Sequence, residues 1–561
     1  MHVRRTLLLL LGVAFVIGSA ACAPEEPGVE EAPDDVDVDE PSPDAPEEEA
    51  PPEEVAGGTL VVGIGSDPGH LNPAVTTQGG LHTASEILYN GLVELDDDLN
   101  PVPELAESWE IEDDGALYRF HLRDDVVWHD GEPFTSADVQ YTFEEALLEY
   151  HSRTRASMAD IIEAIETPDE HTVEFRFAEP YAPLLLQLDV VEAPIIPRHI
   201  YEGTDPEQND EANLNPVGTG PFRFVSYTPD SEIRLERNPD YFRAGLPHFD
   251  ELVMRIMPDE STQVIALEAG EVDWLWGVPG PDLERLQADP AFDTLETNRN
   301  PGGSNCIMTV SFNLERALFD DVRVRRALAH ALDREAFLER VRFGEGAVAQ
   351  APISSGIPFA HAEGLDMPEH DVEEAAALLE EAGWVDDGDT RVAQGVDGVE
   401  DGTPLAFDFV HFPAFTPYGE LLRAQLGAVG ADVTLRALEP PVFTETVFTD
   451  RDFDTNIVSY CNGNDPEIGV RRMYISGNIA PIPFSNSSAY RNERVDELFD
   501  LALRTVDLDE RSEQYREIQE ILVEELPYFW LVETTATRIF RAECGGFRPY
   551  ALFAEEAYCD G

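Results

Sequence analysis

The segment Ser459–Arg472, with the sequence SYCNGNDPEIGVRR, brings together side chains that could do chemistry. It holds one cysteine, two asparagines, an aspartate and a glutamate on either side of a proline, and two adjacent arginines. A guanidinium group can bind a carboxylate through two parallel hydrogen bonds, and it can equally be neutralised by a neighbouring glutamate. The segment could therefore serve as a catalytic centre, a metal site or the wall of a ligand pocket.

Motifs elsewhere in the chain favour none of the known catalytic or metal chemistries. A phosphate-binding loop needs a lysine, and all 36 basic residues of this chain are arginines. The patterns GxSxG, HExxH and CxxC do not occur, and the 13 histidines include no pair at the spacing of a metal-binding helix face. We interpret His129, in VVWHDGEPF, as a structural residue of a polar turn. We therefore expect no enzymatic activity, no metal and no cofactor.

Two tryptophans, Trp274 and Trp276, stand two residues apart in the segment EVDWLWGVPGP. In a strand they would share one face, because side chains alternate there with a period of two. Such a pair can form a stacking wall for a ligand, or it can pack inside a core. The residues alone leave both interpretations open.

The N-terminus has the pattern of a secretory signal peptide, which we place at residues 1–21. Arg4 and Arg5 precede an apolar run that ends at Ile17 and is too short to span a bilayer comfortably. The sequence SAAC resembles the lipobox of bacterial lipoproteins, in which Cys22 would be acylated and become the mature N-terminus. The alternative is an ordinary cleaved signal with a chance cysteine. In both cases we expect an exported protein.

The stretch from Ala23 to Gly57 consists mostly of Glu, Asp, Pro, Ala and Val, and it contains no basic or aromatic residue. It cannot build a core, so we expect a disordered tether over residues 22–57. Its reach would be about 30 Å as a coil and about 110 Å when extended. That reach suits a lipid-anchored domain held clear of a membrane.

The formal net charge is −77 at pH 7, and the tether supplies only a minor part of it. So large a charge opposes the compact state through self-repulsion, which dissolved salt screens. We therefore hypothesise an exported protein of a salt-adapted bacterium, with a halophilic acidic surface. The negative field also argues against a nucleic-acid partner.

The salt hypothesis predicts a thermal midpoint of unfolding that rises markedly between low and molar salt. Screening is strong in molar salt, because the Debye length there falls to about 3 Å. Thermal unfolding followed by circular dichroism at the two salt concentrations checks this prediction. A midpoint that does not respond to salt would contradict it.

The chain has five cysteines, and an exported protein tends to pair its thiols. Cys544 and Cys559 flank a short C-terminal segment, and a bridge between them would stabilise the fold by about 3 kcal/mol in the chain-entropy model. Cys306 and Cys461 form the second candidate pair, although they lie far apart in the sequence. The alternative for each pair is two buried free thiols.

The roughly 500 residues after the tether are too many for one simple core and imply two or more lobes. Apolar residues in Gly58–Ser66 and Thr172–Ala178 are typical of strands, and those in Asp320–Val341, Asp371–Trp384 and Arg494–Val506 have helical spacing. Strands and helices interleave along the chain, which predicts an α/β fold.

Several blocks together resemble family 5 of the extracellular solute-binding proteins, the lipoprotein receptors of ABC importers for peptides, dipeptides and nickel. The most specific block is Glu86–Glu144, which carries YNGL, PELAESW, FHLR and WHDGEPFTSADV in the family's order. Four more blocks follow in that order, at Gly218–Phe242, Ala266–Trp274, Phe312–Glu335 and Tyr490–Ala502. The resemblance extends from the tether nearly to the end of the chain.

The resemblance implies a periplasmic-binding-protein-like type II fold, in which two hinged α/β lobes enclose a ligand and lobe I carries an inserted subdomain. The expected boundaries are 58–89, 215–305 and 532–561 for lobe I, 90–214 for the inserted subdomain, and 306–531 for lobe II.

The same resemblance implies a non-catalytic receptor that binds a small-molecule or oligopeptide ligand and delivers it to an ABC permease and its ATPase subunits. We expect a monomer, anchored by lipid to the outer face of the cytoplasmic membrane. Two other functions stay open: an exported hydrolase of peptides or glycans, and a ligand sensor of the same fold that signals to a membrane kinase.

The resemblance also places ligand contacts on both lobes. Peptide-binding members present an aspartate to the ligand's α-ammonium where this chain has Asn462, and an amide cannot neutralise a buried cation. Either Asp465 takes that role or the ligand has no free cationic N-terminus, and the two arginines favour a polar or anionic ligand. The expected ligand-binding residues are Thr76, Thr77, Gln78, Trp276, Tyr460, Asn462, Asp465, Arg471, Arg472, Phe484 and Asn486.

Overall fold

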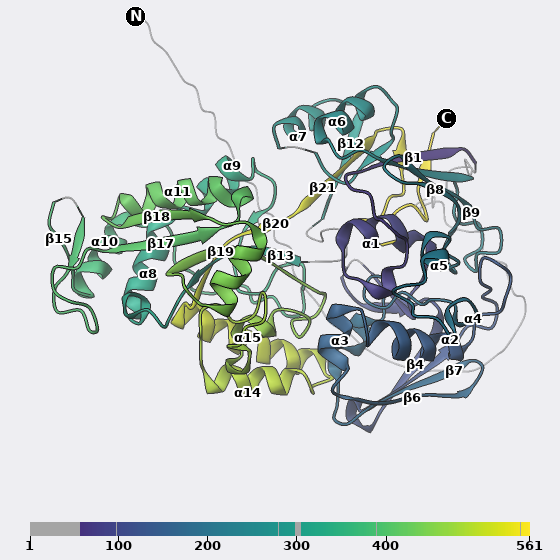
Figure 1. Cartoon of the computed structure of the whole chain (residues 1–561), viewed down its shortest axis with the longest axis horizontal. Helices are drawn as coiled ribbons and strands as arrows, with labels where there is room; N and C mark the ends of the chain where they lie inside the picture. The colour runs from purple at the N-terminus through teal and green to yellow at the C-terminus, as the bar shows by residue number, and fades with distance from the viewer. Residues whose placement is uncertain are drawn as a thin grey trace, which may run out of the picture. The chain divides into compact units, whose positions relative to one another are not determined.

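The computed structural model of the chain contains three main β-sheets (Figure 1). It describes residues 57–96, 98–278, 280–297, 305–388, 390–549 and 551–560. The expected signal peptide, Cys22 and nearly all of the expected tether lie outside the described residues. No helix within these ranges is both long and apolar enough to cross a bilayer.

A seven-stranded sheet forms the centre of the range expected for lobe I. Strand β1 (Thr59–Ile64) lies inside this sheet because Leu60, Val62 and Ile64 are buried, and it pairs in parallel with strands β10 and β11. In spatial order the strands are β12 (Phe292–Thr297), β21 (Ala536–Arg541), β11 (Trp274–Leu275), β1, β10 (Glu251–Ile256), β9 (Glu232–Arg237) and β8 (Phe222–Thr228). Its neighbouring helices are α1 (Gly79–Ser85), α6 (Glu260–Glu268) and α7 (Gly280–Gln287).

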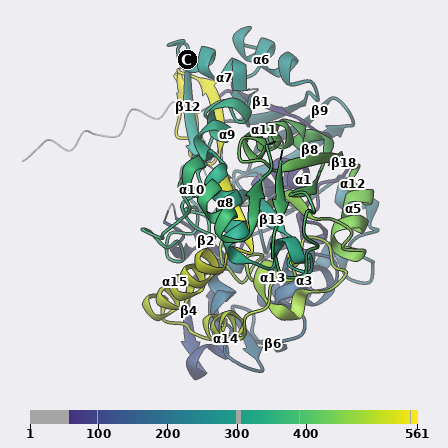
Figure 2. The ribbon, with the colours of Figure 1, turned by 90° about the vertical axis from the view of Figure 1, so that its left-hand side faces the viewer.

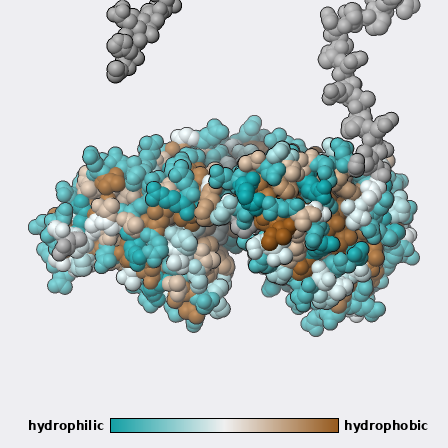
Figure 3. All heavy atoms as spheres, turned by 90° about the horizontal axis from the view of Figure 1, so that it is seen from above, coloured by the Kyte–Doolittle hydropathy of each residue, from teal (hydrophilic) through white to brown (hydrophobic). Residues whose placement is uncertain are grey.

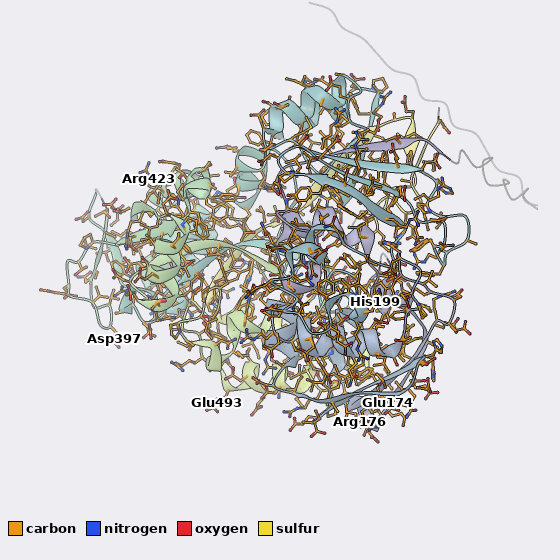
Figure 4. All side chains as sticks on the ribbon, turned by 45° about the vertical axis from the view of Figure 1, so that its right-hand side comes forward. Glu174, Arg176, His199, Asp397, Arg423 and Glu493 are labelled. Atoms are coloured by element: carbon orange, nitrogen blue, oxygen red, sulfur yellow. A yellow bond between two sulfur atoms is a disulfide. The ribbon has the colours of Figure 1, made fainter. Side chains whose placement is uncertain are left out.

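A four-stranded antiparallel sheet forms the centre of the expected inserted subdomain. Its strands in spatial order are β4 (Ala106–Glu112), β5 (Leu117–Leu122), β7 (Thr172–Phe177) and β6 (Ile162–Asp169). Val173, Phe175 and Phe177 of β7 are buried, whereas Glu174 and Arg176 form an ion pair on the other face (Figure 4). The buried core continues without a break into that of the seven-stranded sheet.

The subdomain's shorter elements complete this part of the chain. They are β2 (Val93–Leu95), β3 (Pro101–Pro103), α2 (Ser136–Tyr141), the π-helical turn Thr142–Leu147, α3 (Ser152–Met158), α4 (Arg198–Tyr201) and α5 (Asp210–Leu214). Helix α3 lies at the side of the subdomain that faces the third sheet (Figure 1).

A six-stranded sheet forms the centre of the expected lobe II. All eight residues of β13 are buried, as expected of a strand that pairs on both sides, with β19 and with β20. In spatial order the strands are β14 (Ala347–Val348), β20 (Tyr528–Thr534), β13 (Asn305–Phe312), β19 (Thr455–Asn462), β17 (Ala406–His411) and β18 (Asp432–Ala437). Strand β20 continues in this sheet beyond residue 531, the expected end of the lobe.

The helices around this sheet begin at capping side chains that accept hydrogen bonds from first-turn backbone amides, as helix starts require. The capping residues are Asp321 of α8 (Val322–Ala331), Asp333 of α9 (Arg334–Val341), Asp371 of α10 (Val372–Glu381), Asn492 of α14 (Glu493–Ala502) and Asp507 of α15 (Leu508–Glu525). The helical pattern of Asp320–Val341 is therefore two helices rather than one, because Leu332 is extended and Asp333 caps a second start.

The remaining helices and strands are short or lie at the edge of this sheet. They are α11 (Thr416–Gly427), α12 (Pro440–Thr444), α13 (Arg471–Tyr474), the hairpin of β15 (Trp384–Asp386) with β16 (Arg391–Ala393), and the C-terminal pair β22 (Cys544–Gly545) and β23 (Tyr558–Cys559).

The chain passes from the six-stranded to the seven-stranded sheet through a single residue, Thr535, between β20 and β21 (Figure 1). The two parts meet again where the amide of Ala182 donates to the carbonyl of Leu503 at 2.9 Å, and where Arg504 pairs with Glu179 at 2.6 Å. Seen from above, the surface is notched between them (Figure 3). The structure thus has a direct strand connection that can serve as a hinge, together with a second line of contact.

Candidate functional site

The segment Ser459–Arg472 begins on strand β19 and ends in the short helix α13. Asn462, the last residue of the strand, lies opposite Asn305 at the start of β13, and Cys461 lies opposite Cys306. A disulfide joins these two cysteines, with Cα atoms 4.0 Å apart, and Cys461 is exposed. The C-terminal pair, Cys544 and Cys559, is also disulfide-bonded. The loop after Asn462 therefore starts at a covalently held point close to the crossing between the sheets.

Asp465 is buried inside this loop and cannot face a ligand. Its two carboxylate oxygens accept hydrogen bonds from the guanidinium group of Arg511, at 2.6 and 2.8 Å, and both side chains are almost fully buried. Asp465 also accepts from the backbone amide of Glu467 at 2.9 Å. Both oxygens of the Asp465 carboxylate, an expected ligand contact, are thus committed within the lobe, where they hold the loop to helix α15.

The buried Glu467 carboxylate and the partly exposed Arg471 form a second pair beside the first. The Glu467 carboxylate accepts from Arg471 at 3.1 Å and from the hydroxyl of Tyr515 at 3.1 Å. Arg471 pairs in addition with Asp500 at 2.5 Å. The Arg471 guanidinium is already neutralised within its own lobe, so it does not serve as the open anion site that the sequence suggested.

Burial raises the pKa of Glu467 to about 7, from an ordinary value of 4.5. The folded state therefore binds more protons than the unfolded state between pH 4.5 and 7, and this group's contribution to stability falls as the pH rises through that window. Across this pH window the contribution of Glu467 to the free energy of unfolding falls by about 3 kcal/mol. We expect Glu467→Gln to match the wild type below pH 4.5 and to be the more stable protein above pH 7.

Urea unfolding at a series of pH values measures this difference. The exposed Glu497→Gln is the matched control, because it removes the same charge from the surface of α14. If both variants track the wild type at every pH, the raised pKa of Glu467 is contradicted.

Arg472 differs from its neighbour in having no counter-ion. Its Nη2 donates to the carbonyl oxygen of Cys461 at 3.2 Å, and its Nε is buried without a hydrogen-bond partner among the described residues. Within those residues no carboxylate oxygen lies within 4.0 Å of its guanidinium group. Of the two adjacent arginines, Arg472 alone keeps an uncommitted guanidinium group.

Tyr460 and Asn486 are structural residues, which corrects two further expected ligand contacts. Tyr460 is only 1% exposed, and its hydroxyl bonds to Ser487 at 3.1 Å. Asn486 is fully buried and bonds to both backbone groups of Tyr490. Phe484 is partly exposed, with its ring 5.5 Å from that of Phe448. Tyr460 and Asn486 hold the strand and the following loop together and have no surface for a ligand.

Asn462 occupies the position at which an aspartate is expected in peptide-binding relatives. It is 6% exposed, and its amide oxygen is buried without a hydrogen-bond partner among the described residues. The same oxygen lies against Gly469, where a Cβ atom would come within 2.5 Å of it, and Gly469 has a φ of +121°. The position thus carries a neutral amide enclosed by its own loop.

The expected contacts of lobe I lie on two separate segments. Thr76, Thr77 and Gln78 lead into helix α1, where Gln78 is exposed and the hydroxyl of Thr77 bonds to Ser152 of α3 at 3.0 Å. Within the described residues, no hydrogen bond or ion pair joins them or Trp276 to the segment 459–472.

The structure separates the roles of the two tryptophans. Trp274 is fully buried and stacks on Phe540 at 5.5 Å, so it is a core residue. Trp276 is partly buried and lies edge-on to Trp274 at 5.7 Å, and the guanidinium of Arg538 lies 5.0 Å above its ring. Only Trp276 has the partial exposure that a stacking contact requires.

Sequence patterns do not point to Arg511, which lies 46 residues beyond its partner Asp465. No local pattern distinguishes this arginine from its exposed neighbours on α15, and only a pairing known in advance could have pointed to it. Among the described residues, no group of three or more His, Cys, Asp or Glu side chains is placed to hold a metal ion.

Comparison with known proteins agrees with this architecture. The family model of the bacterial extracellular solute-binding proteins, family 5, matches residues 100–480. The dipeptide-binding protein of Escherichia coli is 28% identical over 521 residues, which cover 87% of this chain and 92% of that protein.

Solved structures show the same fold. NikA of Brucella suis, in complex with Fe(III)-EDTA, has a TM-score of 0.77 at 25% identity, over 90% of this chain and 100% of that chain. HbpA2 of Haemophilus parasuis has a TM-score of 0.77 at 24% identity, with the same coverage. The expected type II periplasmic-binding fold is confirmed. The chain belongs to family 5 of the bacterial extracellular solute-binding proteins.

Proposed function

We propose that the protein is the substrate-binding lipoprotein of an ABC importer, which captures a peptide-like or other small polar or anionic solute between two lobes and delivers it to a membrane permease. Family membership and the two-part fold support this function. The relatives include a dipeptide-binding protein and a protein solved with a metal chelate, so the family leaves the ligand open. We keep the monomeric state, the halophilic surface and the expected lobe boundaries as parts of the proposal, except that lobe II includes β20 to Thr534.

A hinge explains how such a receptor would signal that it is loaded. The connection through Thr535 lets one sheet rotate against the other, and the contacts of Ala182 with Leu503 and of Glu179 with Arg504 hold them together. A ligand that touches both lobes favours the closed state, and the permease would recognise that state.

The observation that supports a ligand class is the missing counter-charge for an ammonium group. Asn462 is neutral, and Asp465, the only other candidate from the sequence, is committed to Arg511. A buried ammonium without a carboxylate would be costly. We therefore propose a ligand that lacks a free cationic N-terminus.

Titration calorimetry with trialanine and N-acetyl-trialanine tests this. We expect the acetylated peptide to bind at least as tightly as the free amine. Asn462→Asp should shift the preference toward the free amine by roughly tenfold, since it restores the carboxylate. Gln394→Glu, an exposed position next to β16 in the same lobe, is the matched control and should change nothing. A wild-type preference for the free amine would contradict the proposed ligand class.

The lipid anchor is proposed from the sequence around Cys22 alone. Cys22→Ser should release the protein from the membrane fraction of the expressing bacterium into the soluble exported fraction. If the variant fractionates with the membrane as the wild type does, the anchor is at another place or is absent.

A further inference from the structure

The guanidinium group of Arg472 is partly exposed, has no carboxylate partner among the described residues, and has a buried Nε. Two buried arginines of the described chain show how such a charge is satisfied elsewhere in the fold. Arg511 is paired with Asp465, and Arg325 donates to four backbone carbonyl oxygens at the end of helix α15 and near the start of α8. Arg472 has one carbonyl oxygen and a buried Nε with no partner. A charge left in this state costs free energy unless a further group completes it.

The surroundings of Arg472 are positive rather than negative. Arg153, on helix α3 of the expected inserted subdomain, is near enough for its charge to act on Arg472, and α13 and α3 are adjacent in the view of Figure 2. Burial lowers the pKa of Arg472, and the charge of Arg153 lowers it further. Glu192 pairs with Arg153 at 3.0 Å and is 1% exposed. The three side chains therefore carry a net charge of about +1, in a chain whose total is −77.

We propose that Arg472 is the anchor for a carboxylate of the ligand, and that this carboxylate also cancels the repulsion between Arg472 and Arg153 when the two lobes close. This inference rests on the proposed receptor function and narrows its ligand to one with an anionic end. The Nε and Nη donors of a guanidinium group can form two parallel hydrogen bonds with one carboxylate. A guanidinium group without a carboxylate partner therefore favours a ligand with a carboxylate over the same ligand with a neutral amide.

Closure then depends on the charge of the ligand. Without an anion, two like charges oppose each other across the boundary between α13 and α3, and the open state is favoured. A carboxylate bound to Arg472 brings the net charge of Arg472, Arg153 and Glu192 from about +1 to about zero, and the closed state is then favoured over the open state. Arg471 cannot replace Arg472 in this role, because Glu467 and Asp500 already neutralise it.

The first test uses the ligand-free protein and compares adjacent arginines. Arg472→Met should leave the thermal midpoint unchanged or raise it, because it removes an uncompensated charge. Arg471→Met should lower the midpoint by several degrees, because it leaves Glu467 without its partner. Arg340→Met, on the exposed surface of α9, controls for the loss of one positive charge. If Arg472→Met destabilises as much as Arg471→Met, Arg472 is a structural residue and the inference is wrong.

The second test measures binding by calorimetry with N-acetyl-trialanine and its C-terminal amide, and with glutarate and glutaramide. We expect the wild type to bind the acid of each pair on the order of 30-fold more tightly than the amide. Arg472→Gln should abolish this difference, Arg472→Lys should restore part of it, and Arg340→Gln should keep it. Equal binding of acid and amide by the wild type, or an unchanged acid affinity in Arg472→Gln, overturns the inference.

A wild-type protein that binds no member of either pair also contradicts the carboxylate anchor. The receptor function is judged separately, by native mass spectrometry of the small molecules that remain bound during purification from the exporting bacterium. A neutral molecule that remains bound would support the receptor function and contradict the role of Arg472 as a carboxylate anchor. An anion that is bound by the wild type and lost in Arg472→Gln would support the receptor function and the anchor.

Discussion

Replacing Arg511 by methionine should lower the free energy of unfolding by about 3 to 5 kcal/mol, because it leaves the Asp465 carboxylate buried and unpaired. Both carboxylate oxygens of Asp465 accept hydrogen bonds from Arg511, and both side chains are almost fully buried. Arg511 also donates to the backbone carbonyl of Ala502 at 2.7 Å, so it joins the loop after β19 to both α14 and α15. The loss should be nearly the same at low and at molar salt, since a buried pair is poorly screened.

Urea unfolding of Arg511→Met and of Arg494→Met measures this prediction. Arg494 pairs with Glu517 at 2.7 Å between α14 and α15, but both side chains are 46% exposed, so its loss should cost less than about 1 kcal/mol. The double variant Asp465→Leu, Arg511→Met should lose less than the single variant, because no charge is left unpaired. A single variant no less stable than Arg494→Met would show that the buried pair does not hold the loop.

Removing the disulfide between Cys306 and Cys461, by changing both residues to alanine, should cost about 5 kcal/mol in the chain-entropy model. The bond spans 155 residues of one lobe, whereas the bond between Cys544 and Cys559 spans 15. The same model gives about 3 kcal/mol for the shorter loop. The matched control is therefore Cys544→Ala with Cys559→Ala.

Chemical unfolding of the two double variants in molar salt compares these costs. The change at Cys306 and Cys461 should also weaken ligand binding, because it frees the end of β19 immediately before Asn462 and the loop that leads to Arg472. The change at Cys544 and Cys559 should leave binding as it is. If the two double variants lose equal stability, or if the change at Cys544 and Cys559 costs more, the loop-length argument is contradicted. If both bind ligand as the wild type does, the disulfide between Cys306 and Cys461 does not support the ligand site.

The architecture was largely predictable, because local patterns carry it. The alternation of Leu60, Val62 and Ile64 predicts a strand, and the aspartate and asparagine caps of lobe II mark helix starts that the structure contains. The segment Asp320–Val341 has one continuous helical pattern of apolar residues, but it forms two helices. Apolar spacing continued through Leu332, and the start of a second helix at Asp333 was visible in the sequence as a capping residue.

The site was predictable as a segment but not residue by residue. Composition alone does not separate Arg471 from Arg472, because their difference lies in Glu467 and Asp500, which only the folded loop and helix α14 bring to Arg471. Trp274 and Trp276 differ for the same reason, since the seven-stranded sheet covers one of them and leaves the other at its edge.

Residue identity and local spacing were enough to assign the family and the α/β class, and to show that Asn462 replaces an expected aspartate. The tertiary structure decided which charges remain available to a ligand. In the folded chain Asp465 pairs with Arg511, which lies 46 residues further on, and the two charges neutralise each other. Arg472 has the positive charge of Arg153 near it instead, and its own charge is not neutralised. Charge pairing depends on distances between elements remote in the chain, and those distances exist only after the sheets and helices have packed.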